Sequence, residues 1–509
     1  MTQSVPGAAP LPPGIAPMPL SALADLVGPP VRGDSAVSVT GVTLASSEVA
    51  PGDLYAALPG ARTHGVHYLP DALAAGAVAV LTDPTGRADA EPAGVPVLVV
   101  DDPREVLGAV AARVYGEPAR ALQVVGITGT NGKTTTAYLV EAGLTAAGRG
   151  TGLIGTVQTR IRPPGAATAT ELPSARTTPE APVLHALLAD MVAAGVDSVV
   201  MEVSSHALVQ GRVGGVPFAV AGFTNLSQDH LDFHADLEDY FAAKAKLFDG
   251  RAAIEVVDVD DAYGVRLVEL GGRRARTVST RGPGDWTASE VAPAPGGGST
   301  FTLAGPDGRT WSARIRLPGG FNVANAVLAV ALLDAVGVPV PTALAGVADT
   351  VVPGRMEPVD AGQGFLALVD YAHTPDAVAT ALHTLRAATG GKLITVLGCG
   401  GDRDPGKRPA MGAAAADGSD LLVVTDDNPR SEDPAAIRAA MLAGIPAGGR
   451  ESVLEIGDRR AAIAEAVSRA RPGDTVLVAG KGHESGQEVA GVVTPFDDRV
   501  VLRELLGTR

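Results

Sequence analysis

The sequence predicts an α/β protein of three domains. Its 509 residues exceed what one hydrophobic core ordinarily fills, and apolar β-branched runs alternate with helix-like patterns along most of the chain. Such alternation is typical of mostly parallel sheets covered by helices. Hydrophobic residues make up 46% of the chain, enough to fill three cores. We expect a disordered tail over residues 1–20, followed by domains over 21–118, 119–355 and 356–509.

The first domain is expected to be a small α/β module. Short strands are predicted around Asp53–Leu58, Val78–Thr82 and Val95–Val100, and an apolar helical pattern runs from Arg104 to Tyr115. The preceding tail is rich in Pro, Ala and Gly and lacks the basic start of a signal peptide, so we interpret it as mobile.

The second domain opens with the turn "GTNGKTT", Gly129–Thr135, between an apolar strand pattern and a helical one. The N–H groups of such a turn and the helix dipole favour an anion. The pattern G-x-x-x-x-G-K-[ST] is not strictly met, because Ile127 stands at its first position. Lys133 would neutralise nucleotide phosphates, and the hydroxyl of Thr134 or Thr135 would bind Mg²⁺. The alternative is an ordinary strand–helix turn with a solvated lysine.

Two further strands of this domain end in polar residues. Ser198–Val203 carries Glu202 near its end, and Ala219–Thr224 is followed by a cluster. Strand ends are where open α/β sheets place ligands, so these side chains are candidate Mg²⁺ ligands. The cluster consists of Asp229, His230, Asp232 and His234. From Gly271 to Gly320 short alternating segments predict an antiparallel ribbon.

The third domain shows the clearest alternation and predicts a Rossmann-like, doubly wound sheet. Strands are expected at Leu366–Asp370, Leu393–Leu397, Leu421–Thr425 and Thr475–Ala479. Helices are expected at Pro375–Ala388, Ala435–Leu442 and Arg459–Arg469.

Composition narrows the function classes. The net charge of −16 opposes binding to nucleic acid or anionic lipid, and no segment has the roughly 20 apolar residues that a membrane span needs. The one cysteine, Cys399, excludes an internal disulfide and fits a reducing compartment; the alternative is a secreted protein without disulfides. We expect a cytoplasmic protein, monomeric because the acidic composition gives no reason for more.

Several motifs occur along the chain in a fixed order. With them the chain resembles the Mur ligases of peptidoglycan synthesis, and in particular the members of that family that add diaminopimelate. The motifs are "GTNGKTT", "MEVSSHAL", "TNLSQDHLDFH", "FAAKAKLF", "FNVANA", "GRME", "DYAHTPD", "GCGGDRD", "DDNPR" and "AGKGHE". The resemblance covers the chain from about residue 40 to its end. It implies a UDP-substrate-binding first domain, a P-loop ATPase-like central domain and an amino-acid-binding C-terminal domain.

The resemblance also implies an ATP-dependent amide ligase. It would add diaminopimelate to the D-glutamate of UDP-N-acetylmuramoyl-L-alanyl-D-glutamate through an acyl phosphate, with Mg²⁺ screening the attack of one anion on another. By resemblance Glu202, His230, Thr134 and a carbamylated Lys244 hold the metal, and Lys133 acts with them. An unmodified Lys244 ammonium would repel Mg²⁺, whereas a carbamate is an anion.

Three sets of binding residues follow from the resemblance. ATP would contact Gly129, Thr130, Asn131, Gly132, Lys133, Thr134, Thr135, Asn325, Arg355, Asp370 and His373. The UDP-substrate would contact Ser46, Ser47, Thr177, Thr178, Ser204, Gln210 and Arg212. Diaminopimelate would contact Arg403, Asp427, Asn428, Pro429, Arg430, Gly480 and Glu484. For Asn325 the alternative is a helix cap. The first domain has Ala45-Ser46-Ser47 where the family usually has Asp-Ser-Arg, which puts the uridine contacts in doubt, and Asp258 stands where an asparagine is common.

Arg430 follows a predicted strand end, and an arginine there can bind a carboxylate through two parallel hydrogen bonds. Diaminopimelate carries one carboxylate more than lysine, so the segment "DDNPR" favours diaminopimelate over lysine. Asp427 could receive the ammonium, while Asn428 can bond either group. Both the meso and LL isomers fit. The rivals are a sister ligase adding lysine or D-alanyl-D-alanine, folylpolyglutamate synthase, and, in a different class, a nucleotide-dependent switch protein.

Overall fold

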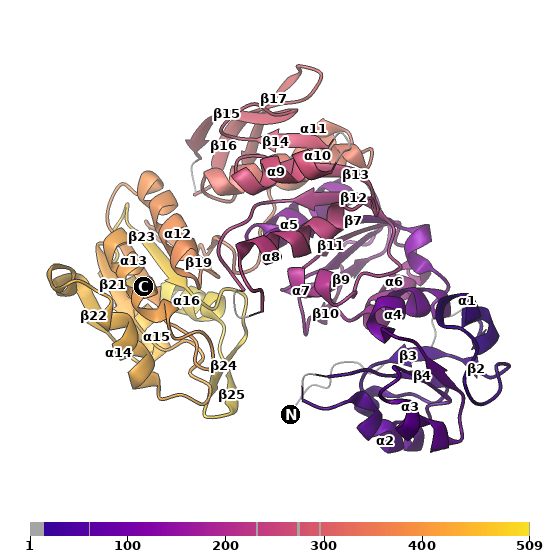
Figure 1. Cartoon of the computed structure of the whole chain (residues 1–509). Coiled ribbons are helices and arrows are strands. Elements are labelled where there is room, and N and C mark those ends of the chain that lie inside the picture. The colour runs from indigo at the N-terminus through magenta and orange to yellow at the C-terminus, as the bar shows by residue number, and fades with distance from the viewer. Residues whose placement is uncertain (1–14, 61, 231–232, 272–274, 295–296, 508–509) are drawn as a thin grey trace. The chain divides into compact units, whose positions relative to one another are not determined.

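The structure is a computed structural model that describes residues 15–60, 62–230, 233–271, 275–294 and 297–507. The chain, drawn in Figure 1, divides into two compact units. The first holds the described residues up to Thr287, with Gly305–Asp307 and Asn325–Val347. The second holds Ala288–Ala304, Gly308–Ala324 and the described chain from Ala348 onward. No helix in the described ranges is long and apolar enough to cross a membrane.

The first unit begins with a small parallel sheet, which confirms the strands expected for the first domain. Its order is β3 (Gly41–Thr43), β4 (Asp53–Ala57), β5 (Ala79–Thr82) and β6 (Val97–Val99). Its helices are α1 (Ala24–Val27), α2 (Leu69–Ala74), α3 (Arg87–Ala90) and α4 (Pro103–Val114). Asp102 caps α4 by accepting hydrogen bonds from the Arg104 and Glu105 N–H groups, and Val110 of that helix packs on the sheet's buried leucines.

The predicted tail ends too late. Strand β1 (Met18–Pro19) pairs with β2 (Ser38–Val39), and Leu20 is fully buried in the core of the small sheet. The sequence did not indicate the pairing of β1 with β2, because β1 has only two residues, too few for an alternating pattern, and lies in a segment rich in Pro and Ala. The expectation of a tail over residues 1–20 is therefore wrong from Met18 onward. Residues 1–14 lie outside the described part of the chain.

A larger sheet forms the rest of the first unit, with its central strands parallel and almost entirely buried. Its strands run in the order β10 (Thr170–Pro173), β9 (Gln158–Arg162), β8 (Thr151–Ile154), β11 (Ser198–Glu202), β7 (Gln123–Thr128), β12 (Phe218–Phe223), β13 (Ala252–Asp258) and β14 (Arg276–Ser279). Its helices include α5 (Lys133–Ala146), α6 (Ala181–Ala193), α7 (Ser205–Val209), α8 (Leu237–Ala245), α9 (Ala262–Leu270) and α11 (Val340–Ala348). Because β7, β11 and β12 are parallel neighbours, their carboxyl ends meet at one edge.

The predicted ribbon over 271–320 is confirmed in part. β16 (Ser299–Ala304) and β17 (Thr310–Ile315) form an antiparallel hairpin in register from Ser299↔Ile315 to Ala304↔Thr310. The start of β15 (Trp286–Pro293), however, pairs in parallel with β14, through Val278↔Trp286 and Ser279↔Thr287. Sequence alternation identifies a strand but not the direction of its neighbour.

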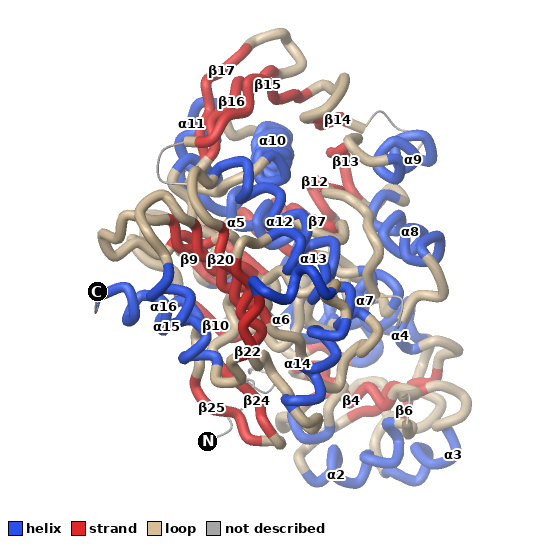
Figure 2. The backbone as a smooth tube through the Cα atoms, turned by 90° about the vertical axis from the view of Figure 1, so that its left-hand side faces the viewer, coloured by secondary structure: helices blue, strands red, loops and turns tan. Residues whose placement is uncertain are grey.

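The second unit is a doubly wound sheet with the order β18 (Glu357–Pro358), β19 (Leu366–Asp370), β23 (Thr475–Ala479), β20 (Leu393–Leu397), β21 (Leu421–Val424) and β22 (Val453–Glu455). All neighbours are parallel except β18 and β19. Side chains of one face pack on α12 (Pro375–Ala388), α13 (Lys407–Gly418) and α14 (Pro434–Ala443). Those of the other face pack on α15 (Arg459–Arg469) and α16 (Asp498–Gly507). Figure 2 shows these helices in blue and the strands in red.

Candidate functional site

The turn after β7 leads directly into α5, as the sequence predicts. Gly129 and Gly132 have φ of 145° and 86°, which side chains rarely adopt, and a Cβ on Gly132 would lie 2.3 Å from Asn325 Oδ1. Gly132 is the N-cap of α5 and offers no side-chain cap. The first-turn N–H groups of α5 therefore suit an anion rather than a capping side chain. The residues present fit a phosphate group.

Residues just past β12 hold this turn in place. The Thr130 N–H donates to Asn225 O (2.8 Å), and the Asn131 N–H donates to Asn225 Oδ1 (3.0 Å). Thr224 Oγ1 donates to Asn131 O at 2.6 Å. The "TNLS" part of the motif "TNLSQDHLDFH" thus supports the turn, which the sequence reasoning did not identify.

Two lysines approach the same carbonyl oxygen of the turn. Lys133 Nζ donates to Gly129 O at 2.9 Å and to Thr130 O at 2.7 Å. Lys244 Nζ, from α8, donates to Gly129 O at 2.7 Å and lies 4.3 Å from the Tyr240 ring centroid. Burial, together with the nearby positive charge of Lys133, holds the pKa of Lys244 well below its usual range.

Thr134 and Glu202 form a hydrogen-bonded pair at the sheet edge. Thr134 Oγ1 donates to Glu202 Oε2 at 2.9 Å, and Glu202 is almost fully buried. Thr156 also donates to this carboxylate, from its N–H to Oε1 (2.7 Å) and from its hydroxyl to Oε2 (3.1 Å). Hydroxyl and carboxylate oxygens are the donors that Mg²⁺ takes, so this pair fits the metal. Sequence reasoning missed Thr156, which no pattern sets apart.

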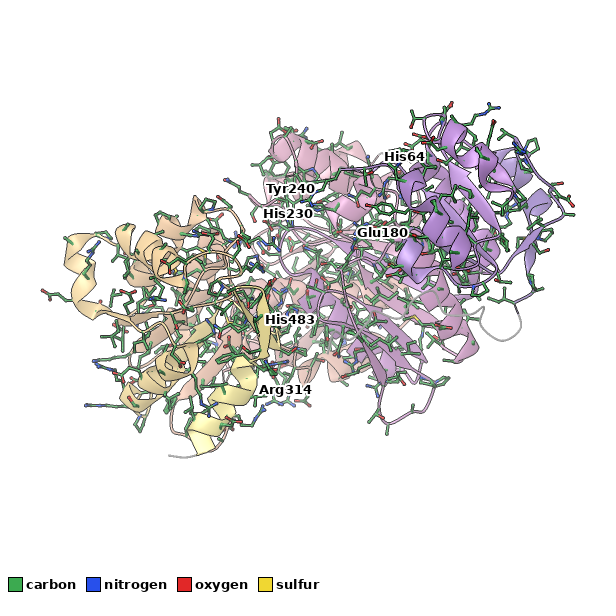
Figure 3. All side chains as sticks on the ribbon, turned by 90° about the horizontal axis from the view of Figure 1, so that it is seen from below. His64, Glu180, His230, Tyr240, Arg314 and His483 are labelled. Carbon is green, nitrogen blue, oxygen red and sulfur yellow. The ribbon has the colours of Figure 1, made fainter. Side chains whose placement is uncertain are left out.

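His230 lies in the left-handed region, with φ of 54°, and its N–H donates to Asp229 Oδ1 at 2.9 Å. Its ring lies edge-on to that of Tyr240, with centroids 6.1 Å apart. Figure 3 labels both residues, which lie next to each other. Tyr240 therefore links His230 to Lys244. Across the residues that the structure describes, no three His, Cys, Asp or Glu side chains are grouped so that they could hold a metal ion; Thr134 and Lys244 are of other types. Asp232 lies outside the described residues.

His234, the last member of the cluster, has a fixed position. Its Nδ1 lies 3.0 Å from Asp239 Oδ2 and its Nε2 lies 2.9 Å from Ser205 Oγ. The ring is buried and joins α7 to α8. A side chain with both nitrogens in such bonds supports the site rather than ligating a metal.

Four residues expected at the UDP-substrate come together after β11. Thr178 Oγ1 donates to Glu202 O at 2.9 Å and accepts from the Ser204 N–H at 3.0 Å. Arg212 donates to Thr178 O (3.0 Å) and to Gln210 Oε1 (2.6 Å), and burial lowers its pKa. Thr177 faces Thr156, with their hydroxyl oxygens 3.0 Å apart.

Ser46 and Ser47 lie elsewhere in the first unit. Both belong to a short 3₁₀ helix over Ser46–Glu48, where Ser46 is half-buried and Ser47 exposed. A ligand can therefore reach both serines. They belong to the small sheet's part of the chain, however, and Thr178 and its partners belong to the larger sheet's part.

Asn325 is not a helix cap. It lies inside α10 (Gly320–Ala335), is 6% exposed, and receives a hydrogen bond from Thr136 Oγ1 at 3.5 Å. Its side chain fills the space beside Gly132. The structure therefore places Asn325 beside the Gly129–Thr135 turn.

In the second unit, Arg355, Asp370 and His373 surround Tyr371. The Arg355 guanidinium carbon lies 4.3 Å from the Tyr371 ring centroid, and the His373 ring centroid lies 4.5 Å from it. Asp370 accepts hydrogen bonds from the Met356 N–H (2.7 Å) and the Ala372 N–H (2.8 Å), while burial raises its pKa. His483 joins the same ring at 5.2 Å, and burial lowers its pKa to about 4. The sequence reasoning used neither Tyr371 nor His483.

The "DDNPR" segment follows β21 and is held by the hairpin of β24 (Gly486–Val489) and β25 (Val492–Pro495). The Arg430 N–H donates to Glu488 O (3.0 Å), and Arg430 Nη1 donates to Gly401 O (2.6 Å). Asp427 lies beside Gly480, where a Cβ would be 2.7 Å from Asp427 Oδ2. Asn428 Nδ2 donates to Glu484 Oε2 at 2.7 Å.

Six of the seven residues expected at diaminopimelate thus lie at the carboxyl ends of β21 and β23 or in the segments that follow them. Arg403 is exposed, and its Nη1 donates only to Asp402 O, at 3.3 Å, within the described chain.

Three family models match the chain. They are "Mur ligase family, catalytic domain" over residues 38–115, "Mur ligase middle domain" over 127–333, and "Mur ligase, glutamate ligase domain" over 354–482. Proteins of Streptomyces avermitilis and Streptomyces coelicolor are 55% and 54% identical to it, each over 98% of both chains. Both are named UDP-N-acetylmuramoyl-L-alanyl-D-glutamate–2,6-diaminopimelate ligase. The chain belongs to the Mur ligase family.

A solved structure of a ligase with that same name is 32% identical to this Mur ligase. The structural match covers 97% of this chain and 99% of the solved chain, with a TM-score of 0.68. The expectation of a three-domain α/β fold with parallel sheets is confirmed. In this Mur ligase most of the candidate residues of the first unit lie around the turn after β7 and the end of β11, and most of those of the second unit lie at the ends of β19, β21 and β23.

Proposed function

We propose that this Mur ligase is an ATP-dependent, ADP-forming amide ligase that adds diaminopimelate to the D-glutamate of UDP-N-acetylmuramoyl-L-alanyl-D-glutamate, in peptidoglycan precursor synthesis. The observation that carries the choice of amino acid is the Asp427–Arg430 loop, fixed at the end of β21 with Arg430 anchored by Gly401 and Glu488. The relatives at 54–55% identity bear the name of this activity.

The phosphate end of ATP is proposed to bind the turn after β7. Lys133 lies over the turn's carbonyls and can extend to a phosphate, while Gly132 leaves the start of α5 uncapped. Thr134 and Glu202 would hold Mg²⁺, whose role is to neutralise charge on the transferring phosphoryl group. Asn325, Arg355, Asp370 and His373 remain the proposed further nucleotide contacts.

Lys244 is proposed to carry a carbamate. A lysine reacts with CO₂ only as the neutral amine, and the depressed pKa of Lys244 supplies that form. The modification would replace a cation beside Lys133 with an anion. It would also supply the metal site with a carboxylate-like ligand alongside Glu202 and His230.

The division of labour between domains also remains a proposal. Residues 21–118 would bind the UDP-substrate, 119–355 ATP, and 356–509 the amino acid, in agreement with the order of the three family matches. Ser46, Ser47, Thr177, Thr178, Ser204, Gln210 and Arg212 are the proposed contacts of the UDP-substrate. A monomer in the cytoplasm stays a prediction.

The proposal is tested by product mass. Purified protein is incubated with ATP, Mg²⁺ and the UDP-dipeptide, and with meso-diaminopimelate, LL-diaminopimelate or L-lysine in separate reactions. A UDP-tripeptide with a diaminopimelate isomer and none with lysine is the expected result and names the isomer. Product with lysine alone would assign a sister ligase. ATP hydrolysis that ignores all three amino acids would favour a nucleotide-dependent switch.

A further inference from the structure

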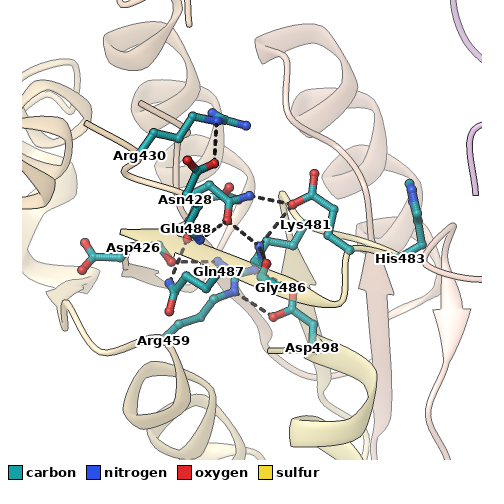
Figure 4. A network of polar contacts seen from close by, with 12 residues as sticks. Asp426, Asn428, Arg430, Arg459, Lys481, His483, Gly486, Gln487, Glu488 and Asp498 are labelled. Atoms are coloured by element: carbon teal, nitrogen blue, oxygen red, sulfur yellow. Dashed lines mark hydrogen bonds and ion pairs between the residues drawn. The ribbon is translucent and has the colours of Figure 1, made fainter. Parts of the chain in front are cut away.

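Lys481, directly after β23, is a wholly buried lysine that the proposed function does not use. Its Nζ donates to Asn428 Oδ1 (3.1 Å), to Glu484 Oε2 (3.1 Å) and to Gly486 O (2.7 Å). Figure 4 labels Lys481, Asn428 and Gly486 within this network. An ammonium group has three hydrogens, and each of these has an acceptor. Burying a charge is costly unless the charged group is fully hydrogen-bonded. The three bonds of Lys481 meet this condition and fix the positions of the groups that accept them.

The bonds of Lys481 bear on the orientation of the Asn428 amide. Asn428 Oδ1 accepts from Lys481 Nζ and from the Glu488 N–H, at 3.1 and 3.0 Å, and both of these groups can only donate. Asn428 Nδ2 donates to Glu484 Oε2 at 2.7 Å, which as a carboxylate oxygen can only accept. If the amide were turned over, its NH₂ group would face the Lys481 ammonium and the Glu488 N–H, and its oxygen would face the Glu484 carboxylate, so all three hydrogen bonds would be lost. Lys481 and the hairpin therefore hold Asn428 in one orientation.

This arrangement leaves a donor and an acceptor for a ligand. Among the residues that the structure describes, the second Nδ2 hydrogen of Asn428 and the Oε1 atom of Glu484 have no hydrogen-bond partner. An N–H donor suits a carboxylate, and a carboxylate oxygen suits an ammonium group. Glu484 is about one-third exposed, so a ligand can reach it. The pair is complementary to an ammonium–carboxylate centre.

We propose that Lys481 is the positioning residue that fixes Asn428 as a donor and Glu484 as an acceptor, so that together they select the ammonium–carboxylate end of the added amino acid. The inference rests on the proposed function. It also decides between the two bonding options of Asn428, since the amide offers its N–H to the ligand. Lysine is excluded because its far end has no carboxylate to receive that hydrogen bond.

The test uses three variants of the full chain. Lys481→Met removes the ammonium at similar length. Asn428→Asp keeps the shape but places an acceptor where the N–H donor stood. Lys392→Met, an exposed lysine in the same unit, is the matched control. KM for diaminopimelate, ATP and the UDP-dipeptide, and the rate with lysine relative to diaminopimelate, are measured for each.

We expect Lys481→Met to raise KM for diaminopimelate by about ten-fold or more, as the loss of one charged hydrogen bond would. KM for ATP should stay within about two-fold, and Asn428→Asp should raise KM for diaminopimelate at least as much as Lys481→Met. Lys392→Met should match the wild type. A general loss of structure would instead lower kcat and shift all three KM values together.

Unchanged KM and selectivity in Lys481→Met overturn the inference, and so does an equal rise of all three KM values. If Lys481→Met fails to fold, Asn428→Asp decides, and a wild-type KM for diaminopimelate in that variant overturns the inference. A wild-type protein that makes no diaminopimelate product overturns the proposed function itself. The two failures are therefore distinguishable.

Discussion

Lys133 and Lys244 donate hydrogen bonds to the same atom, the carbonyl oxygen of Gly129, at 2.9 and 2.7 Å. Burial, together with the nearby positive charge of Lys133, holds the pKa of Lys244 well below its usual range. A lowered pKa raises the share of neutral, nucleophilic amine at Lys244, beside the turn that is proposed to bind phosphate. In the proposed function Lys133 is the cation that meets the phosphates of ATP.

Lys244→Ala should lower kcat by about a hundred-fold or more, because a positioned charge at the reacting phosphate is lost. Lys246→Ala, two residues away and exposed, is the matched control and should keep wild-type activity. ¹³C NMR after incubation with labelled bicarbonate should show a carbamate signal in the wild type and in Lys246→Ala. Normal activity in Lys244→Ala, or a carbamate signal that survives this substitution, would disprove the assignment.

Arg430→Lys should raise KM for diaminopimelate by about an order of magnitude, since a lysine cannot make two parallel hydrogen bonds to a carboxylate. kcat at saturating diaminopimelate should change little. Arg460→Lys in α15, an exposed arginine paired with Glu504, serves as the control. An Arg430→Lys enzyme with wild-type KM and unchanged preference over lysine would remove Arg430 from the site.

Asp258→Asn should stabilise the protein above pH 7. Burial raises the pKa of Asp258 from 3.8 to about 7, so between these values the folded state keeps the proton while the unfolded chain loses it. Stability therefore falls as the pH rises through that window, and the full cost is present above pH 7. The gain in free energy of unfolding should be on the order of 2–4 kcal/mol at pH 8 and vanish toward pH 4.

Urea unfolding of wild type and Asp258→Asn at several pH values measures this gain. Asp89→Asn on α3 is an exposed control and should show no pH-dependent difference. An Asp258→Asn gain that is the same at pH 4 and pH 8 would mean that the carboxylate's charge is not the cause.

Two adjacent arginines of α15 should differ sharply in their effect on stability. Arg459 pairs with Asp498 at 2.7 Å, both fully buried, whereas Arg460 pairs with Glu504 at 2.8 Å with both side chains about half exposed. Arg459→Ala should lower the free energy of unfolding by about 3–5 kcal/mol, because it leaves a buried aspartate unpaired. Arg460→Ala should cost about 0–1 kcal/mol. Urea denaturation would contradict this if the two losses were equal.

Much of the second unit could be predicted because its strands are buried on both faces. The predicted bounds of β19, β20 and β23 agree with the structure, since each is a short run of mostly apolar residues. α12 and α15 were also predicted correctly, and each begins after a side-chain cap, Thr374 and Asp458.

Short elements could not be predicted because tertiary contacts define them. β22 has only three residues, and the β24–β25 hairpin is mostly exposed, so neither has a pattern long enough to recognise. In the sites, sequence spacing identified the strand ends that carry Glu202 and Arg430. It could not identify Thr156 or Lys481, because their roles come from side chains that meet across the sheet edge.

The β24–β25 hairpin that holds the Asp427–Arg430 loop limits how the preference of this enzyme for one amino acid can change during evolution. Arg430 adopts a left-handed backbone with φ of 53°, fastened on one side by Glu488 and on the other by Gly401. A tetrapeptide transplanted into a relative without these supports would have no reason to take that conformation. A change of substrate preference among relatives of this enzyme would thus require the Asp427–Arg430 loop and the segments around Gly401 and Glu488 to change together.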